Sequence, residues 1–126
     1  MATRRSALIN VMAQAALKAA RGAASAMAAR NLERAGRGEQ QINFGLALHL
    51  GEVTYGNIGA KNRLDFTVIG PAVNHAARLE KLAAELGKNV VTSASFAAAV
   101  AEPLHSLGLH LLRGVSQPQE VFTLQP

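Results

Sequence analysis

The stretch FTVIGPAVNHAARLEKLAAELGKNVVTS, residues 66–93, decides the fold because it predicts a strand, a helix and a second strand in succession. Gly70-Pro71 opens the helix, since proline is favoured in the first helical turn, and Gly87 closes it. Between them, apolar residues recur at helical spacing. The expected apolar face consists of Val73, Ala76, Ala77, Leu79, Leu82, Ala83 and Leu86. Residues 89–92 then predict a short buried strand.

Upstream of this stretch, residues 5–35 predict one long helix that Gly36 and Gly38 terminate. Its expected apolar face consists of Leu8, Met12, Ala16, Ala19, Ala23 and Met27. Residues 42–48 alternate between apolar and other residues, which is typical of a strand. A second short strand is expected at residues 52–55.

Downstream, Ser93 or Ser95 is expected to cap a small helix. Residues 104–113 and 120–125 predict two final strands, joined by a turn over residues 114–118. Helices interleaved with strands on a small chain favour an α+β sandwich, in which helices cover a mostly antiparallel sheet.

The composition excludes several classes of protein. The 126 residues suffice for one domain with a core, and the absence of cysteine excludes disulfides, thiolate metal sites and cysteine nucleophiles. No apolar run is long enough to span a membrane, and no secretory signal is visible, so we expect a cytoplasmic protein. Four Phe and one Tyr are too few for a base-stacking nucleic-acid platform.

The net charge of +5 belongs to one segment of the chain. Residues 1–40 hold seven basic and two acidic residues, whereas residues 41–126 hold six of each. We therefore divide the chain into an Ala- and Arg-rich helical segment (1–40) and a second part (41–126). A solvated basic helix face is favoured for the first segment over a transit peptide or a nucleic-acid-binding patch.

Asn74 and Arg78 are the strongest candidates for chemistry that the residues alone suggest. They lie four apart, so they share one face of the central helix near the positive end of its dipole. An amide beside a guanidinium suits a nucleotide phosphate, although such a pair is more often a solvated helix face. The glycines of residues 51–56 lack the Lys-Ser/Thr of a P-loop. His49 and Glu52 tend to face opposite sides of a strand, which disfavours a metal pair. The remaining histidines are isolated in the sequence: His75, His105 and His110.

Several short motifs support a more specific interpretation. They are HLGE (49–52), GNIG (56–59), RLDFT (63–67), VIGPAVN (68–74), AARLE (76–80), LRGVSQP (112–118) and VFTL (121–124). Together they resemble the C-terminal half of a class III adenylate/guanylate cyclase catalytic domain, from about residue 42 to the C-terminus. The resemblance implies a ferredoxin-like cyclase sandwich whose N-terminal strands are missing from this chain.

The resemblance also implies an activity, the conversion of ATP to cyclic AMP and pyrophosphate with Mg²⁺ or Mn²⁺ between two head-to-tail domains. It implies that Asn74 orients the ribose and that Arg78 stabilises charge at the α-phosphate in the transition state. Thr67 matches a purine-selecting position and favours ATP over GTP. Arg113 either meets the triphosphate or is a solvated loop charge.

The metal-binding aspartates that the resemblance implies have no counterpart here. Asp65 is the only aspartate of the chain, and we expect it to fix a turn. The chain is therefore expected to supply one half of a composite site, to be inactive alone, and to oligomerise or pair with a second cyclase domain. We expect either a piece of a larger cyclase or a degenerate domain. The alternative is a non-catalytic interaction or regulatory module with the same fold.

Overall fold

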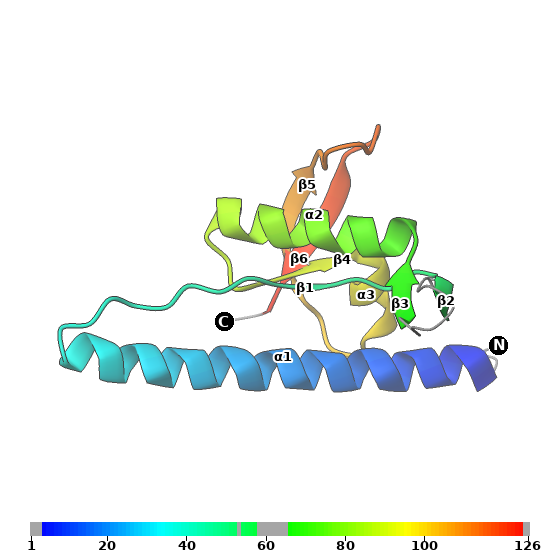
Figure 1. Cartoon of the computed structure of the whole chain (residues 1–126). Helices are drawn as coiled ribbons and strands as arrows, with labels where there is room; N and C mark the ends of the chain where they lie inside the picture. The colour runs from blue at the N-terminus through cyan, green and yellow to red at the C-terminus, as the bar shows by residue number, and fades with distance from the viewer. Residues whose placement is uncertain (1–3, 53, 58–65, 125–126) are drawn as a thin grey trace.

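The computed structural model describes residues 4–52, 54–57 and 66–124, and Figure 1 shows how its elements are arranged. In chain order the elements are α1 (Arg4–Gly36), β1 (Leu46–Leu48), β2 (Thr54–Asn57), β3 (Phe66–Ile69), α2 (Pro71–Leu86), β4 (Val90–Ser93), α3 (Ala94–Ala99), β5 (His105–His110) and β6 (Gln119–Thr123). The order of helices and strands confirms the prediction, and the differences lie at the ends of elements.

Four of the strands form one sheet, in the order β1-β4-β6-β5. β1 runs parallel to β4, with Leu46 opposite Val90. The pairs β4–β6 and β5–β6 are antiparallel. β2 and β3 form a separate antiparallel hairpin, in which Thr54 lies opposite Ile69. The sheet is therefore mostly antiparallel, which confirms the predicted α+β fold.

α2 packs on one face of the sheet and contributes to the main core. Leu79 and Ala83 are fully buried against Val91 of β4 and Val121 of β6. Val73, which belongs to the predicted apolar face, is instead 38% exposed, because the first turn of α2 lies outside this core. Ala77 of that face is exposed as well. The prediction is therefore confirmed only for the part of the face around Leu79 and Ala83, which orients the rest of the helix.

α1 and α3 lie on the other side of the sheet (Figure 1), and the predicted apolar face of α1 is wrong. Leu8 and Met12 are 60% and 62% exposed, whereas Ala13, Leu17 and Ala20 are buried. Ala13 and Leu17 form a second core cluster together with two residues from α3 and its C-terminal cap. Alanine occurs on every side of α1, so its weak periodicity did not identify the face that packing selects.

A polar network fixes the rotation of α1. The amide of Gln14 donates to Glu102 Oε1 at 3.0 Å, and its oxygen accepts from the backbone N–H of Ala101 at 3.2 Å. Arg21 forms an ion pair with the same carboxylate. These interactions attach α1 to the loop that precedes β5.

The predicted strand over residues 42–48 is shorter than expected, because β1 begins only at Leu46. The side chain of Asn31 donates to the carbonyl of Ile42 at 2.9 Å and accepts from its N–H at 2.7 Å. A side chain of α1 thus satisfies both backbone groups that a neighbouring strand would otherwise pair. The segment follows α1 back toward the sheet, as Figure 1 shows.

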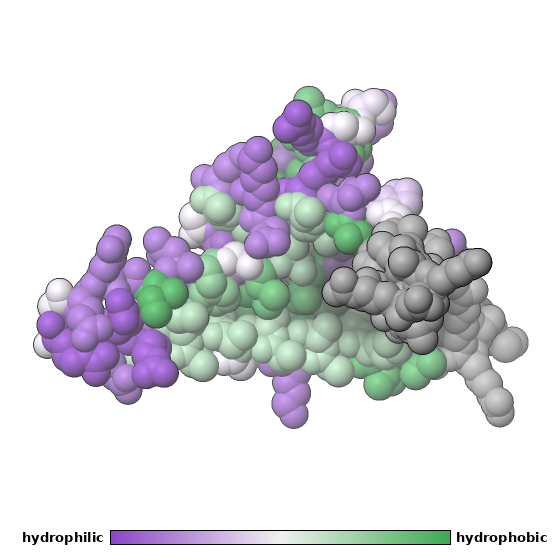
Figure 2. All heavy atoms as spheres, viewed as in Figure 1, coloured by the Kyte–Doolittle hydropathy of each residue, from purple (hydrophilic) through white to green (hydrophobic). Residues whose placement is uncertain are grey.

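Hydrophilic residues gather at the C-terminal end of α1, whereas the middle of the helix presents a weakly hydrophobic surface (Figure 2). Arg34 and Arg37 lie 3.1 and 2.9 Å from the carboxylate of Glu39. Part of the basic excess of this segment is therefore neutralised locally. Within the described part of the chain, no helix combines the length and the apolar character that a membrane span requires.

Candidate functional site

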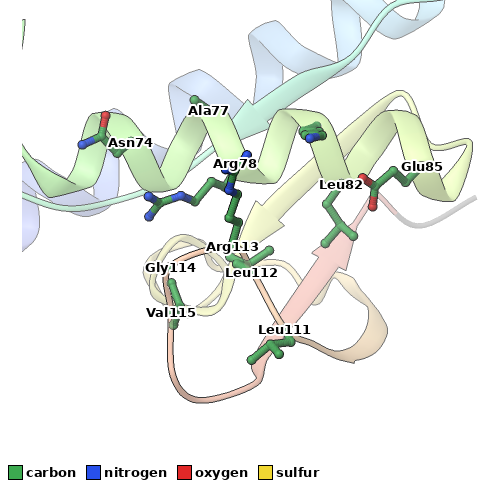
Figure 3. A pocket seen from close by; sticks show the side chains of 11 residues that line it. Asn74, Ala77, Arg78, Leu82, Glu85, Leu111, Leu112, Arg113, Gly114 and Val115 are labelled. Atoms are coloured by element: carbon green, nitrogen blue, oxygen red, sulfur yellow. The ribbon is translucent and has the colours of Figure 1, made fainter.

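A groove of about 710 Å³ lies between α2 and the turn that follows β5. Its lining consists of Asn74, Ala77, Arg78, Lys81, Leu82, Glu85, Leu111, Leu112, Arg113, Gly114 and Val115. Figure 3 shows Arg78 extending from the helix and Arg113 extending from the turn toward it. The structure therefore brings together Asn74, Arg78 and Arg113, although Asn74 and Arg113 are 39 residues apart in the sequence.

Two buried leucines fix the positions of the two sides of the groove. Leu79 anchors α2 on the sheet, which leaves the adjoining Arg78 half-buried beside the groove and Asn74 exposed at its end. Leu112 is 4% exposed and anchors the turn in the same core. Arg113 follows Leu112 in this turn and lines the groove.

Gly114 lets the turn approach Arg78 closely. Its φ of +79° is a conformation that other residues rarely adopt. A Cβ at this position would lie only 3.0 Å from Arg78 Nη2. The N–H of Val115 donates to the carbonyl of Leu112 at 3.0 Å and closes the turn. The sequence predicted a turn here, but it did not indicate that a side chain at this glycine would meet the candidate arginine.

Lys81 and Glu85 also line the groove, and sequence analysis missed both. Their spacing gave the available signal, since Lys81 lies three residues after Arg78 and Glu85 lies four residues after Lys81. Three cations, Arg78, Lys81 and Arg113, thus surround the groove with a single carboxylate. The charge balance suits an anion such as a phosphate chain.

Thr67 is placed by its backbone only. It lies in β3 opposite Gly56, and three residues separate it from the start of α2. Its side chain lies outside the described part of the structure, and so does all of Asp65. The predicted roles of these two residues therefore remain predictions.

The groove does not fit the two-metal site of a nucleotidyl cyclase. Such a site needs several carboxylates that converge on the ions, whereas the groove offers Glu85 among three cations. Among the described residues, no group of three or more His, Asp or Glu side chains is arranged to hold a metal. The charges that line the groove therefore suit an anion better than a divalent cation.

His75 is not isolated, contrary to the expectation from sequence. Its ring lies against that of His49, with 4.3 Å between the centroids. Burial, and then the neighbouring His75, lowers the pKa of His49 below its usual 6.5. Burial, and then the guanidinium of Arg78, lowers the pKa of His75. The pair joins the end of β1 to the first turns of α2, one turn before Arg78.

Comparison with known proteins identifies relatives for part of the chain. Over 66 residues it is 38% identical to an adenylate cyclase of Anabaena cylindrica, which covers 52% of this chain and 13% of that enzyme. A bacterial light-regulated adenylyl cyclase of known structure aligns with a TM-score of 0.52 and 32% identity, covering 60% of this chain and 22% of that one. The guanylyl cyclase Cya2 aligns with a TM-score of 0.59 and 26% identity, covering 77% and 49%. No protein-family model matches the chain.

Proposed function

We propose, from the premise that part of this chain is homologous to class III adenylyl and guanylyl cyclase catalytic domains, that it supplies the ribose and transition-state half of an adenylate cyclase site. The observation that carries the proposal is the convergence of Asn74, Arg78 and Arg113 on one cationic groove. The chain spans less than a sixth of the length of the curated relatives that it matches. The activity and partners of the whole protein are therefore part of the proposal.

In the proposed reaction, the 3′-hydroxyl oxygen of ATP forms a bond to the α-phosphorus. The bond from that phosphorus to the bridging oxygen breaks, pyrophosphate leaves, and the hydroxyl proton passes to water. Asn74 holds the ribose through its amide, which offers both a donor and an acceptor. Arg78 donates to the non-bridging oxygens of the α-phosphate, where negative charge develops.

The remaining cations of the groove act on the leaving group. Arg113, which extends from the turn toward the helix (Figure 3), is proposed to bind the β- and γ-phosphates. Thr67 is proposed to select the purine, and its hydroxyl accepts a hydrogen bond from the adenine amino group. ATP is therefore the proposed substrate in preference to GTP.

The metal ions, Mg²⁺ or Mn²⁺, are proposed to be held by a second cyclase domain. Support comes from the groove's own charge, since three cations around one carboxylate repel a divalent ion. The two domains then share one nucleotide between them. The alternative is a non-catalytic module that pairs with a cyclase. The same observation supports it, because the groove lacks the carboxylates of a metal site.

Reconstitution with a complementary domain tests the proposal. The partner is a class III adenylyl cyclase domain that keeps its metal-binding aspartates but has lost its own transition-state Asn and Arg. We expect cyclic AMP from ATP and Mn²⁺ only in the mixture, and about 10²–10³-fold less when the chain carries Arg78→Ala.

The controls distinguish the catalytic half-site from the non-catalytic module. Arg30→Ala removes an exposed arginine of α1 and is expected to leave turnover unchanged. Cyclic AMP formed by the chain alone, increasing with concentration, would contradict the half-site proposal. A complex that forms without any turnover would favour the non-catalytic module.

A further inference from the structure

A hydrogen-bonded cluster around His49 lies outside the groove, and no step of the proposed reaction uses it. His49 follows β1, and its Nδ1 lies 2.8 Å from the hydroxyl of Ser93 at the start of α3. The hydroxyl of Ser93 lies 3.0 Å from that of Ser95, which donates to the carbonyl of Leu50 at 2.9 Å. The backbone N–H of Phe96 donates to Ser93 at 3.2 Å.

All of these contacts are hydrogen bonds in only one arrangement of the protons. Ser95 has one hydroxyl proton, and the carbonyl of Leu50 takes it, because a carbonyl can only accept. Ser95 must therefore accept from Ser93, which uses the single proton of that hydroxyl as well. The only donor left for the 2.8 Å contact is His49 Nδ1–H. This arrangement predicts the Nδ1–H tautomer for neutral His49, with a lone pair on Nε2.

The other side of the His49 ring faces α2. A Cβ on Gly51 would lie 3.1 Å from His49 Nε2 and 2.8 Å from the Cβ of Ala72, in the first turn of that helix. The ring of His75 lies against that of His49. His49 therefore fills the space between the β4–α3 junction and the N-terminal turns of α2.

We infer that His49 is a positioning residue for the groove: its Nδ1–H bond to Ser93 fixes the ring, and the ring, through His75, holds the start of α2 where Asn74 and Arg78 line the groove. The hydrogen bond to Ser93 and the contact with the ring of His75 come from different elements, and together they give the His49 ring a single orientation. The inference rests on the proposed function only for its effect on turnover.

The surroundings of the pair favour neutral rings. Arg78 acts on His75 from α2, and the hydroxyls of Ser93 and Ser95 face His49 from the β4–α3 junction. α1 contributes apolar side chains to the adjoining cavity, namely Ile9, Met12, Ala13 and Ala16. Glu52 follows on the same loop and takes part in an interaction of its own. Protonation of both rings would place two cations in contact beside Arg78, and the start of α2 would be pushed away.

The first test measures the tautomer directly, in the unmodified full chain. Two-bond nitrogen–proton NMR correlations distinguish Nδ1–H from Nε2–H in each histidine ring. We expect the Nδ1–H form for His49 at pH 7.5 and a shift of the Arg78 Nε–H resonance as the pair becomes protonated. An Nε2–H tautomer, or an Arg78 resonance that does not shift during this titration, would overturn the inference.

The second test uses two amides of different length. His49→Asn keeps an N–H near the position of Nδ1, whereas His49→Gln moves it toward the position of Nε2. In the reconstituted cyclase we expect about 10²-fold less turnover for the glutamine variant. The asparagine variant should lose less, because it keeps the bond to Ser93 but not the ring contact with His75. His105→Asn, at an exposed position of β5, is the matched control.

The Arg78 resonance of each variant separates this inference from the proposed function. A displaced resonance in His49→Gln that returns in His49→Asn supports the positioning role even if no cyclase activity is found. Equal resonances in all variants would overturn it even if Arg78 proves essential for turnover.

Discussion

Gly114 combines an unusual backbone conformation with a position next to the candidate residue Arg78. It adopts a φ of +79°, and a side chain there would contact the guanidinium of Arg78 at 3.0 Å. Gly108 on β5 supplies a matched comparison, because its φ is +86° but an added Cβ would meet nothing within 4 Å. The two positions thus share a backbone requirement and differ in what a methyl group would touch.

We therefore predict different outcomes for alanine at the two glycines. Gly114→Ala and Gly108→Ala should each lower the free energy of unfolding by about 1–2 kcal/mol, the cost of a left-handed conformation. Only Gly114→Ala should also reduce turnover of the reconstituted cyclase, because it displaces Arg78. Urea denaturation and a cyclic AMP assay measure the two effects. An equal loss of turnover in both variants would show that backbone strain, not the contact with Arg78, is responsible.

Arg78 itself tests whether the site needs a planar, forked cation. Arg78→Lys keeps the charge but loses the two parallel donors that match a phosphate. We predict that turnover falls nearly as far as in Arg78→Ala, while the urea midpoints of both variants stay close to that of the parent chain. Full activity of the lysine variant would mean that Arg78 acts only as a point charge.

At the scale of elements, α1 shows how packing chooses among the faces of an alanine-rich helix. Leu17 is fully buried against α3, whereas Leu8, on the face that periodicity suggested, is 60% exposed. The polar network from Gln14 and Arg21 to Glu102 holds this rotation. α1 therefore belongs to the core of the domain through a short buried stripe.

Truncation of the two leucines measures this difference. Leu17→Ala should lower the free energy of unfolding by about 2–5 kcal/mol, because it removes buried methyl groups and leaves a cavity. Leu8→Ala is its matched control and should change stability by less than about 0.5 kcal/mol. The comparison uses urea denaturation of both variants at one pH. Similar losses in the two would mean that α1 packs with a different rotation.

At the scale of the whole molecule, the histidine pair couples stability to pH. The pKa values of His49 and His75 are lowered in the folded chain, so the unfolded chain binds more protons near pH 6. The resulting stability is complete above the unfolded pKa of 6.5 and is lost as the pH falls toward the folded pKa values.

We predict that the free energy of unfolding decreases between pH 7.5 and 5.5, and that His49→Asn reduces this dependence. Urea titrations at a series of pH values measure it. The control is His105→Asn, which should retain the full dependence. A stability that rises on acidification over this range would contradict the lowered pKa values.

The exposed apolar surface of the chain bears on its quaternary state. Large apolar side chains are exposed on α1, in β5 and just after β5: Leu8, Val11, Met12, Leu32, Leu109 and Leu111. Such surface favours association, so we predict oligomers at tens of micromolar chain. Light scattering that gives a single monomeric mass at this concentration would contradict the prediction.

The sequence by itself determined the local elements and the identity of the candidate residues. Gly70-Pro71 and Gly87 set the ends of α2, the hydroxyl of Ser93 caps α3, and the spacing of Asn74 and Arg78 places both on one helix face. These features depend on residues a few positions apart, whose conformational preferences act before any tertiary contact forms. The cyclase motifs are equally local, which is why they could be read from the chain.

Only the tertiary structure decided which distant groups meet. It brought Arg113 and Gly114 to Arg78, stacked His75 on His49, and turned Leu17 rather than Leu8 into the core. It also paired Ile42 with the side chain of Asn31, which shortened the expected strand. Each of these contacts joins separate elements, and its geometry follows from how the helices pack on the sheet. No periodicity within one segment contains that information.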